Sequence, residues 1–260
     1  MSDAINAQDK TKDFKLLKPK NDIVFQRLFN KDNEKITKAF VEALLDKKVD
    51  TIVINEDKEL LGETIEDKTG ILDLELNIDD REKVDVEIQL VNRSNFVERL
   101  LFYFSKLYSK EIERGKGYNQ AKRVVLVAIL DYNLELLSFT KEMETIWKLR
   151  EEKNKEAVLT DAIEIHIISL NKVKNSYIEN KTDLKAQWML FLDDPNSKEV
   201  LEIMKKNKEI KEASVEVKKL SKDEKLQRLA FLREKAILDE KSIYGAGLED
   251  GVKQGIEQRN

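Results

Sequence analysis

With 260 residues, 41% of them hydrophobic, the chain is long enough for one sizeable globular domain with an appendage. It contains no cysteine and a single histidine, which excludes disulfides, thiolate zinc sites and multi-histidine metal sites, so any bound metal would take oxygen ligands. A formal net charge of −4 argues against an overall basic surface for nucleic acid, and without a membrane-spanning apolar run or a signal-peptide core we expect a cytoplasmic protein with no membrane partner.

The first elements predicted along the chain are helices. Residues 1–17 are polar and unpatterned, and we interpret them as a flexible tail. Apolar residues then recur at helical spacing from Ile23 to Phe29 and from Ile36 to Leu45, which predicts two helices. Residues 51–54 favour a first strand.

Two short segments, Ile71–Leu76 and Val84–Leu90, alternate apolar and polar side chains with a period of two, which predicts a hairpin with one buried face. The polar residues on the other face are Asp73, Glu75, Asp85, Glu87 and Gln89. A turn near Asp80 would pair positions whose numbers sum to about 160 to 162. Asp73 then lies opposite Glu87 or Gln89, and Glu75 lies opposite Asp85 or Glu87. Facing carboxylates repel one another unless a cation lies between them.

The acidic face of this hairpin has two interpretations. Antiparallel strands often bury one face and leave a charged face in water. On the other hand, we interpret this face as lacking the lysines that usually balance exposed acids, and the next segment, Asn92–Arg123, carries eight basic residues against three acids. Asp73 and Glu87 together would then bind a hard divalent cation such as Mg²⁺ or Mn²⁺.

Further helices and strands are predicted after the hairpin. A helix with an apolar stripe from Phe96 to Tyr108 precedes the uninterrupted apolar run Arg123–Leu130, which suits a strand covered on both faces. A weaker strand pair at about residues 145–151 and 162–170 follows. After Asn175 the pattern is helical, and Ser221–Glu224 has the form of a capping box for the last helix.

These elements predict an α/β fold with a mixed sheet flanked by helices and an all-helical C-terminal extension. The predicted division is a flexible tail at 1–17, an α/β domain at 18–175, a helical region at 176–243 and a glycine-spaced mobile tail at 244–260.

Several other residues have both a functional and a structural interpretation. Gln89 cannot act as a base, but its amide can orient a water molecule or donate to a phosphate oxygen. Arg99 and Tyr103 share one helix face and would either reach a phosphodiester or form a cation–ring pair on the helix surface. His166 lies in an apolar run and is interpreted as structural, and both tryptophans, Trp147 and Trp188, as core.

A set of ordered motifs resembles a known family. The motifs are Lys20–Phe29 (KNDIVFQRLF), Gly70–Asp73 (GILD), Val86–Gln89 (VEIQ), Arg99 and Tyr103 four residues apart after Phe96, and Gly115–Tyr118. Over about residues 18 to 250, the chain resembles the Rpn family of recombination-promoting nucleases and transposases, within the PD-(D/E)XK nuclease superfamily. Gln89 stands in the lysine place of that superfamily's motif.

This resemblance implies a restriction-endonuclease-like fold for residues 18–175 and a catalytic set of Asp73, Glu87 and Gln89. It further implies a metal held by Asp73, Glu87 and the Ile88 carbonyl, with Asp22 as a possible additional acid. From their shared helix face, Arg99 and Tyr103 are the residues expected to contact DNA. The implied metal is Mg²⁺, with Mn²⁺ or Ca²⁺ as alternatives.

The resemblance also has departures, since Gln26 replaces a lysine usual at its place and Ala121-Lys122 replaces leucine and proline. Neither departure touches the acids expected to bind the metal. Two functions stay open, the second because of the acidic overall charge and the helical C-terminal third of the chain. The first is a divalent-metal-dependent DNA endonuclease associated with recombination, transposition or defence against foreign DNA. The second is a catalytically inactive DNA-binding or protein-interaction module that retains the nuclease fold. Either could form a homo-oligomer.

Overall fold

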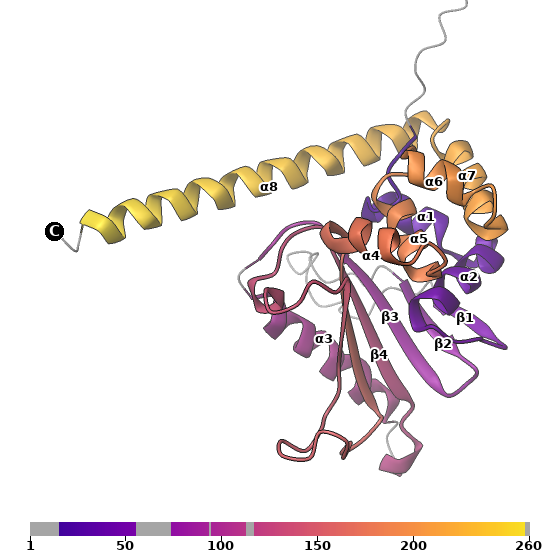
Figure 1. Cartoon of the computed structure of the whole chain (residues 1–260), viewed down its shortest axis with the longest axis vertical. Coiled ribbons are helices and arrows are strands. Elements are labelled where there is room, and N and C mark those ends of the chain that lie inside the picture. The colour runs from indigo at the N-terminus through magenta and orange to yellow at the C-terminus, as the bar shows by residue number, and fades with distance from the viewer. Residues whose placement is uncertain (1–15, 56–73, 94, 113–116, 258–260) are drawn as a thin grey trace, which may run out of the picture.

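The computed structural model of the protein describes residues 16–55, 74–93, 95–112 and 117–257 (Figure 1). Most of the tail predicted at residues 1–17 lies outside these ranges. The α-helices are α1 (Asp22–Leu28), α2 (Glu34–Leu45), α3 (Phe96–Glu111), α4 (Val173–Glu179), α5 (Leu184–Asp193), α6 (Lys198–Ile203), α7 (Lys208–Leu220) and α8 (Glu224–Glu257). The strands are β1 (Ile52–Asn55), β2 (Leu74–Ile78), β3 (Glu82–Gln89), β4 (Arg123–Leu130), β5 (Glu144–Trp147) and β6 (Ile163–Ser169).

The strands form one mixed six-stranded sheet in the order β1-β2-β3-β4-β6-β5. Strands β3, β4 and β6 are parallel at its centre, and the outer pairs β1–β2, β2–β3 and β5–β6 are antiparallel. A parallel β3–β4 pair needs a crossover connection, and α3 supplies it. The predicted α/β class with a mixed sheet and flanking helices is therefore confirmed.

The hairpin β2–β3 pairs Leu74 with Val86 and Glu75 with Asp85, so the paired numbers sum to 160 as one of the predicted registers requires. Its turn places Asp79 and Asp80 in the left-handed region, at φ 50° and 52°. Aspartate tolerates this conformation better than most residues do. The Asp79 carboxylate also accepts hydrogen bonds from the backbone N–H groups of Asp50 and Thr51, which fixes the turn against the start of β1.

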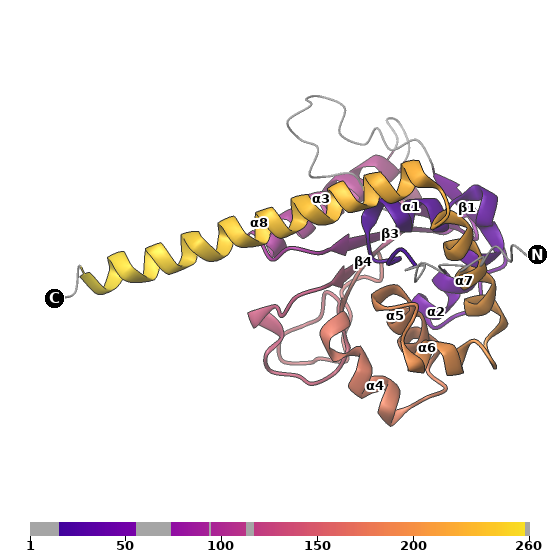
Figure 2. The ribbon, with the colours of Figure 1, turned by 90° about the horizontal axis from the view of Figure 1, so that it is seen from above.

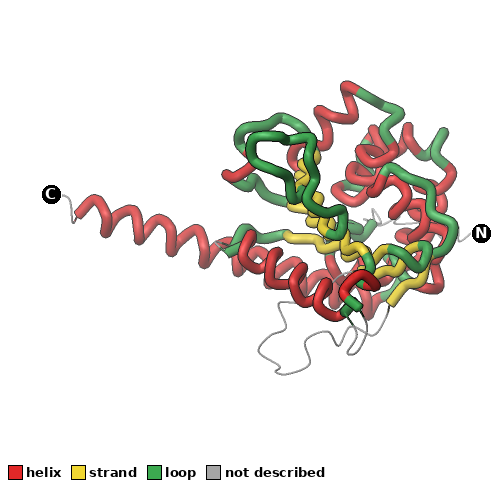
Figure 3. The backbone as a smooth tube through the Cα atoms, turned by 90° about the horizontal axis from the view of Figure 1, so that it is seen from below, coloured by secondary structure: helices red, strands yellow, loops and turns green. Residues whose placement is uncertain are grey.

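Helices cover both faces of the sheet (Figure 2). On one face, α3 packs on β4 and β6 through a core that includes Leu100, Phe104, Leu126 and Ala128. The other face carries the larger core, to which α1, α2 and α4 to α7 contribute together with the opposite side of the strands. Figure 3 shows the strands lying between these two helical layers. Among the described residues, no helix is long and apolar enough to cross a membrane.

The last helix, α8, starts against α1 and then extends away from the rest of the molecule (Figure 1). Asp223 caps it, because its carboxylate accepts the backbone N–H of Leu226 over 3.0 Å, whereas Ser221, the predicted cap, donates to the Val217 carbonyl. The helix continues to Glu257, where the sequence predicts a mobile glycine-spaced tail. Glycine weakens a helix by about 1 kcal/mol per residue but does not remove a backbone donor as proline does.

Candidate functional site

The polar face of β3 is buried under α3 instead of facing water. Lys83, Asp85 and Glu87 are only 8%, 0% and 4% exposed. Asp85 and Glu87 pair in register with Leu126 and Ala128 of β4, and both of those residues pack in the core beneath α3. The interpretation of this hairpin as a solvated sheet face is therefore wrong.

A lysine balances the acids at the turn end of this face. Lys83 Nζ lies 2.9 Å from Glu75 Oε1 and 3.1 Å from Glu111 Oε1. Burial alone would lower the pKa of Lys83, but the bonds to these two carboxylates outweigh it, so that its pKa is raised. The sequence interpretation missed Lys83 when it took this face to lack lysines, and Glu75 belongs to this ion cluster.

Glu87 and Gln89 lie together at the other end of β3. Gln89 Nε2 donates to Glu87 Oε2 over 3.1 Å. Burial raises the pKa of Glu87, and the positive charge of Arg99 together with the hydrogen bond from Gln89 offsets only part of that effect. A carboxylate buried in this way is stabilised by a proton or a cation, which is the electrostatic condition for a metal ligand.

Arg99 and Tyr103 form the pair that their spacing on α3 predicts. Arg99 Cζ lies 5.8 Å from the centre of the Tyr103 ring, within range of a cation–π interaction. Tyr103 is buried, at 8% exposure, whereas Arg99 is half-buried. The positive charge of Arg99 acts on Glu87, so the first turns of α3 lie near the Glu87 end of β3.

Asp22 is held by α8 instead of by the sheet. Its Oδ2 accepts a hydrogen bond from Arg233 Nε over 2.6 Å, and its Oδ1 accepts the backbone N–H of Ile23. Among the described contacts, none joins Asp22 to Glu87. The structure thus ties the first-helix acid to the C-terminal helix.

Asp73, the other acid of the predicted catalytic set, lies outside the described residues. Ile88, whose carbonyl is the third predicted metal ligand, pairs in register with Ile129 of β4. Within the described ranges, no group of three or more histidine, aspartate or glutamate side chains is placed to hold a metal ion. The predicted metal set therefore stays a prediction.

The sequence interpretation did not single out several neighbours of this region. Tyr132 follows β4, packs edge-on against Phe96 at 6.3 Å, and lies near the charges of Arg93 and Arg99. Burial raises its pKa to about 12, so the phenol stays protonated. The sequence could have indicated Tyr132 through its place two residues after β4, because residues just past the carboxyl ends of parallel strands commonly line binding sites.

Lys20 is also fixed at this edge of the sheet. Its Nζ lies 2.9 Å from Asp131 Oδ1 and 2.7 Å from Asp193 Oδ1, while the backbone N–H of Asp131 donates to the Gln89 carbonyl. These bonds connect the Lys20–Phe29 motif to the end of β3 through the residue after β4.

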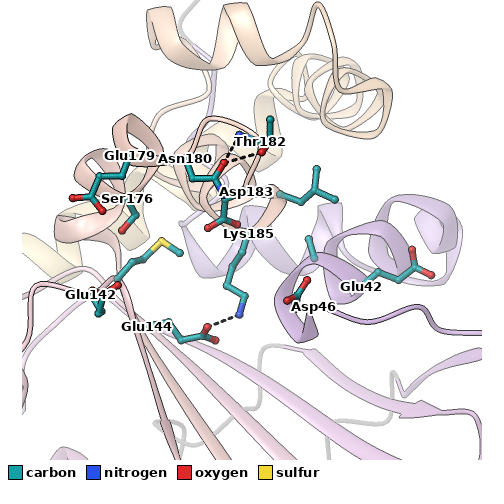
Figure 4. Close-up of a pocket in the computed structure, with 13 residues that line it drawn as sticks. Glu42, Asp46, Glu142, Glu144, Ser176, Glu179, Asn180, Thr182, Asp183 and Lys185 are labelled. Atoms are coloured by element: carbon teal, nitrogen blue, oxygen red, sulfur yellow. Dashed lines mark hydrogen bonds and ion pairs between the residues drawn. The ribbon is translucent and has the colours of Figure 1, made fainter.

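The opposite face of the sheet has a cavity of about 670 Å³ (Figure 4). Its acidic lining includes Glu42 and Asp46 from the end of α2, and Lys185 of α5 reaches Glu144 of β5 across it. Glu144 also contacts His166, whose two ring nitrogens each lie 2.8 Å from a carboxylate oxygen, of Glu144 and Glu164. His166 thus fastens β5 to β6, as its structural interpretation predicts.

A family model, described as "PD-(D/E)XK nuclease family transposase", matches residues 19–246 of the chain. The chain belongs to this family. No curated protein and no solved structure gave a significant match. The matched range begins just before α1 and ends within α8, so it includes the whole sheet, α3 and the Glu87–Gln89 pair. The fold of this PD-(D/E)XK family member is a restriction-endonuclease-like mixed sheet with flanking helices.

Proposed function

We propose that the protein is a divalent-metal-dependent endonuclease that hydrolyses phosphodiester bonds of DNA. The observation that carries this proposal is the buried carboxylate of Glu87, with the Gln89 amide bonded to it and the Arg99 cation nearby, in a chain of a PD-(D/E)XK nuclease family. Membership of that family implies DNA as the substrate, and its description as a transposase family supports a role in recombination or transposition.

The donor chemistry suits a hard cation. Carboxylate and carbonyl oxygens are the ligands that Mg²⁺ and Mn²⁺ prefer, and the raised pKa of Glu87 reflects a burial cost that a cation would offset. Asp73, Glu87 and the Ile88 carbonyl would hold the ion, with Ca²⁺ as a further candidate. Once bound, a divalent cation supplies charge that stabilises the negative charge developing on a phosphate.

The remaining residues of the site would position the Glu87 carboxylate and neutralise the charge of a DNA phosphate. The Gln89 amide is too weakly basic to accept a proton, so it would orient Glu87 and donate to a phosphate or a water molecule. Arg99 carries a permanent positive charge that a phosphate can share with Glu87. Tyr103 is buried, so its part would be to support Arg99 through its ring and not to contact DNA directly.

Nicking of supercoiled plasmid tests this proposal. The purified full chain should convert plasmid to open circles with Mg²⁺ or Mn²⁺, and chelation should abolish the reaction. Asp73→Ala and Glu87→Ala should lose activity, whereas Glu179→Ala, an exposed acid on α4, should retain it. Equal nicking by Glu87→Ala and the unaltered protein would refute the assignment.

A second function is favoured by Gln89 itself. The amide stands where the superfamily motif has a lysine, which leaves the site without that cation and suits a DNA-binding or partner-binding module without hydrolysis. Such a module would bind DNA or a partner equally well after Glu87→Ala and in the presence of a chelator. Loss of binding on chelation would count against it.

A further inference from the structure

A second cavity, of about 410 Å³, lies beside the Glu87–Gln89 pair at the carboxyl ends of β4 and β6. Leu130 and Ser169, the last residues of those strands, line it, together with Tyr132 and the segment that follows. Gln89 pairs in register with Leu130, and Leu130 pairs with Ser169. Since neighbouring strands lie about 4.8 Å apart, the cavity begins one strand spacing from the proposed site and reaches about 10 Å from Gln89.

Two buried hydroxyl groups of this cavity's lining residues have no hydrogen-bond partner within the described part of the chain. They are the phenol of Tyr132, 9% exposed as a residue, and the hydroxyl of Ser169, 3% exposed. Buried polar groups are nearly always paired, because leaving one unpaired is unfavourable. Because both residues line the cavity, a ligand with hydrogen-bonding atoms that binds there would supply the missing partners.

The lining combines apolar and polar side chains, and its one acid is Glu135. Leu130, Leu134 and Leu137 provide the apolar part, and Asn133, Ser138 and Thr140 provide amide and hydroxyl groups. The one lysine, Lys172, donates to the carbonyls of Leu137 and Thr140, so its charge is engaged in holding this segment in place. A flat molecule with apolar faces and donors and acceptors on its rim matches such a lining better than an ion does.

We propose that this cavity receives a nucleobase of the DNA strand held at the neighbouring site, turned out of the base stack. The proposal rests on the proposed function, which brings DNA to Gln89. A base turned out of the stack is read by hydrogen bonds along its edge and by contact of its faces with aromatic or apolar side chains, and Tyr132 and the leucines are of those kinds. Asn133, Ser138 and Thr140 of the lining offer hydrogen-bonding groups to such a base, in addition to the hydroxyls of Ser169 and Tyr132.

Photocrosslinking tests the proposal directly. Single-stranded and duplex oligonucleotides with 5-iodouracil in place of thymine are irradiated with the full chain in the presence of a chelator, and the adduct is located by mass spectrometry. We expect an adduct on Tyr132. Ser138→Leu, at an exposed position on the rim, and Ser169→Leu, deeper in the cavity, should abolish that adduct. Ser176→Leu, the same change in the other cavity, should retain it.

The outcomes separate this proposal from the proposed function. Bound DNA with adducts only at other residues, or an undiminished Tyr132 adduct in Ser138→Leu, would overturn the base cavity even if plasmid is nicked. A Tyr132 adduct without nicking would support the cavity and refute the hydrolysis. Saturation transfer from the protein to free thymidine without a DNA adduct would assign the cavity to a free nucleoside and overturn the proposal. A lack of DNA binding both in the chelator and with a divalent cation would overturn both proposals.

Discussion

The Gln89 amide donates a hydrogen bond of 3.1 Å to the buried Glu87 carboxylate, two residues away on the same strand. This bond favours the ionised form of Glu87, while burial favours the protonated form and raises its pKa. The charge state of the proposed metal ligand is therefore set by a balance that the side chain at position 89 can shift in either direction.

Changing Gln89 should move the pKa of Glu87 in opposite directions with different replacements. Gln89→Lys places a cation beside the carboxylate and should lower its pKa. Gln89→Leu removes the hydrogen bond and should raise it further. Carbon-13 NMR of the Glu87 carboxyl during a pH titration measures both shifts without relying on activity.

Gln254→Lys supplies the control for this series, because position 254 is exposed on the far part of α8 and should leave the titration of Glu87 unchanged. A rise in the Glu87 pKa on Gln89→Lys would contradict the electrostatic account of the site.

Replacing Glu87 by glutamine should stabilise the metal-free protein. Because the pKa of Glu87 is raised in the folded state, its contribution to stability is greatest below its unfolded value, near 4.5, and is lost as pH rises through the folded pKa. Glu87→Gln removes this loss, so the free energy of unfolding at pH 7 should increase by about 1 kcal/mol, at the expense of activity. Urea unfolding in a chelator measures it. Glu75→Gln breaks the Lys83 ion pair and should have the opposite sign.

Periodicity in the sequence predicted which β2 and β3 residues share a face and the register that brings Glu75 opposite Asp85. It could not predict that α3 buries the polar face, because a period of two distinguishes the faces without saying what covers each. The same limit explains Trp147, which was interpreted as core and is 39% exposed on the edge strand β5.

Contacts between residues far apart in the sequence could not be predicted from hydrophobic periodicity either. Nothing local in the sequence connects Asp22 to Arg233, which lie more than two hundred residues apart. Tyr132 belongs to no recognisable motif, and it lies near the Glu87–Gln89 pair because β4 ends beside Gln89. The boundary predicted between residues 175 and 176 and the assignment of Asp73 stay predictions.

Acid should weaken the fold through Glu164. Burial would raise the pKa of this carboxyl, but bonds from Lys148 and His166 and the charge of Arg123 lower it to about 2. A lowered folded pKa means that the stabilisation is complete above the unfolded value, near 4.5, and is lost as pH falls toward 2. Glu164→Gln should flatten the dependence of unfolding free energy on pH in this window and cost about 2 kcal/mol at pH 7. An unchanged slope would contradict this prediction.

The ion pair between Arg93 and Glu240 should make a measurable contribution to holding α8 against the rest of the molecule. Arg93 Nε lies 2.7 Å from Glu240 Oε1, and both side chains are about one-third exposed, at 30% and 36%. A double-mutant cycle of Arg93→Ala and Glu240→Ala should give a coupling energy of about 0.5 to 1 kcal/mol. Hydrogen exchange of the α8 amides before Glu240 should accelerate in either variant, and a cycle with Lys253 and Asp250, which pair within α8, should leave that exchange unaltered.

The two tryptophans should differ sharply in what they contribute to stability. Trp188 is 2% exposed, and its ring centre lies 5.5 Å from that of Phe40 and 5.8 Å from that of Phe191, where α2 and α5 meet. Trp188→Ala would leave a large cavity there and should cost about 3 to 5 kcal/mol. Trp147 bonds only Thr145 through its indole N–H among the described contacts, so Trp147→Ala should cost less than about 1 kcal/mol. Urea unfolding followed by circular dichroism compares them, and equal losses would mean that the edge strand β5 is covered by a further contact in solution.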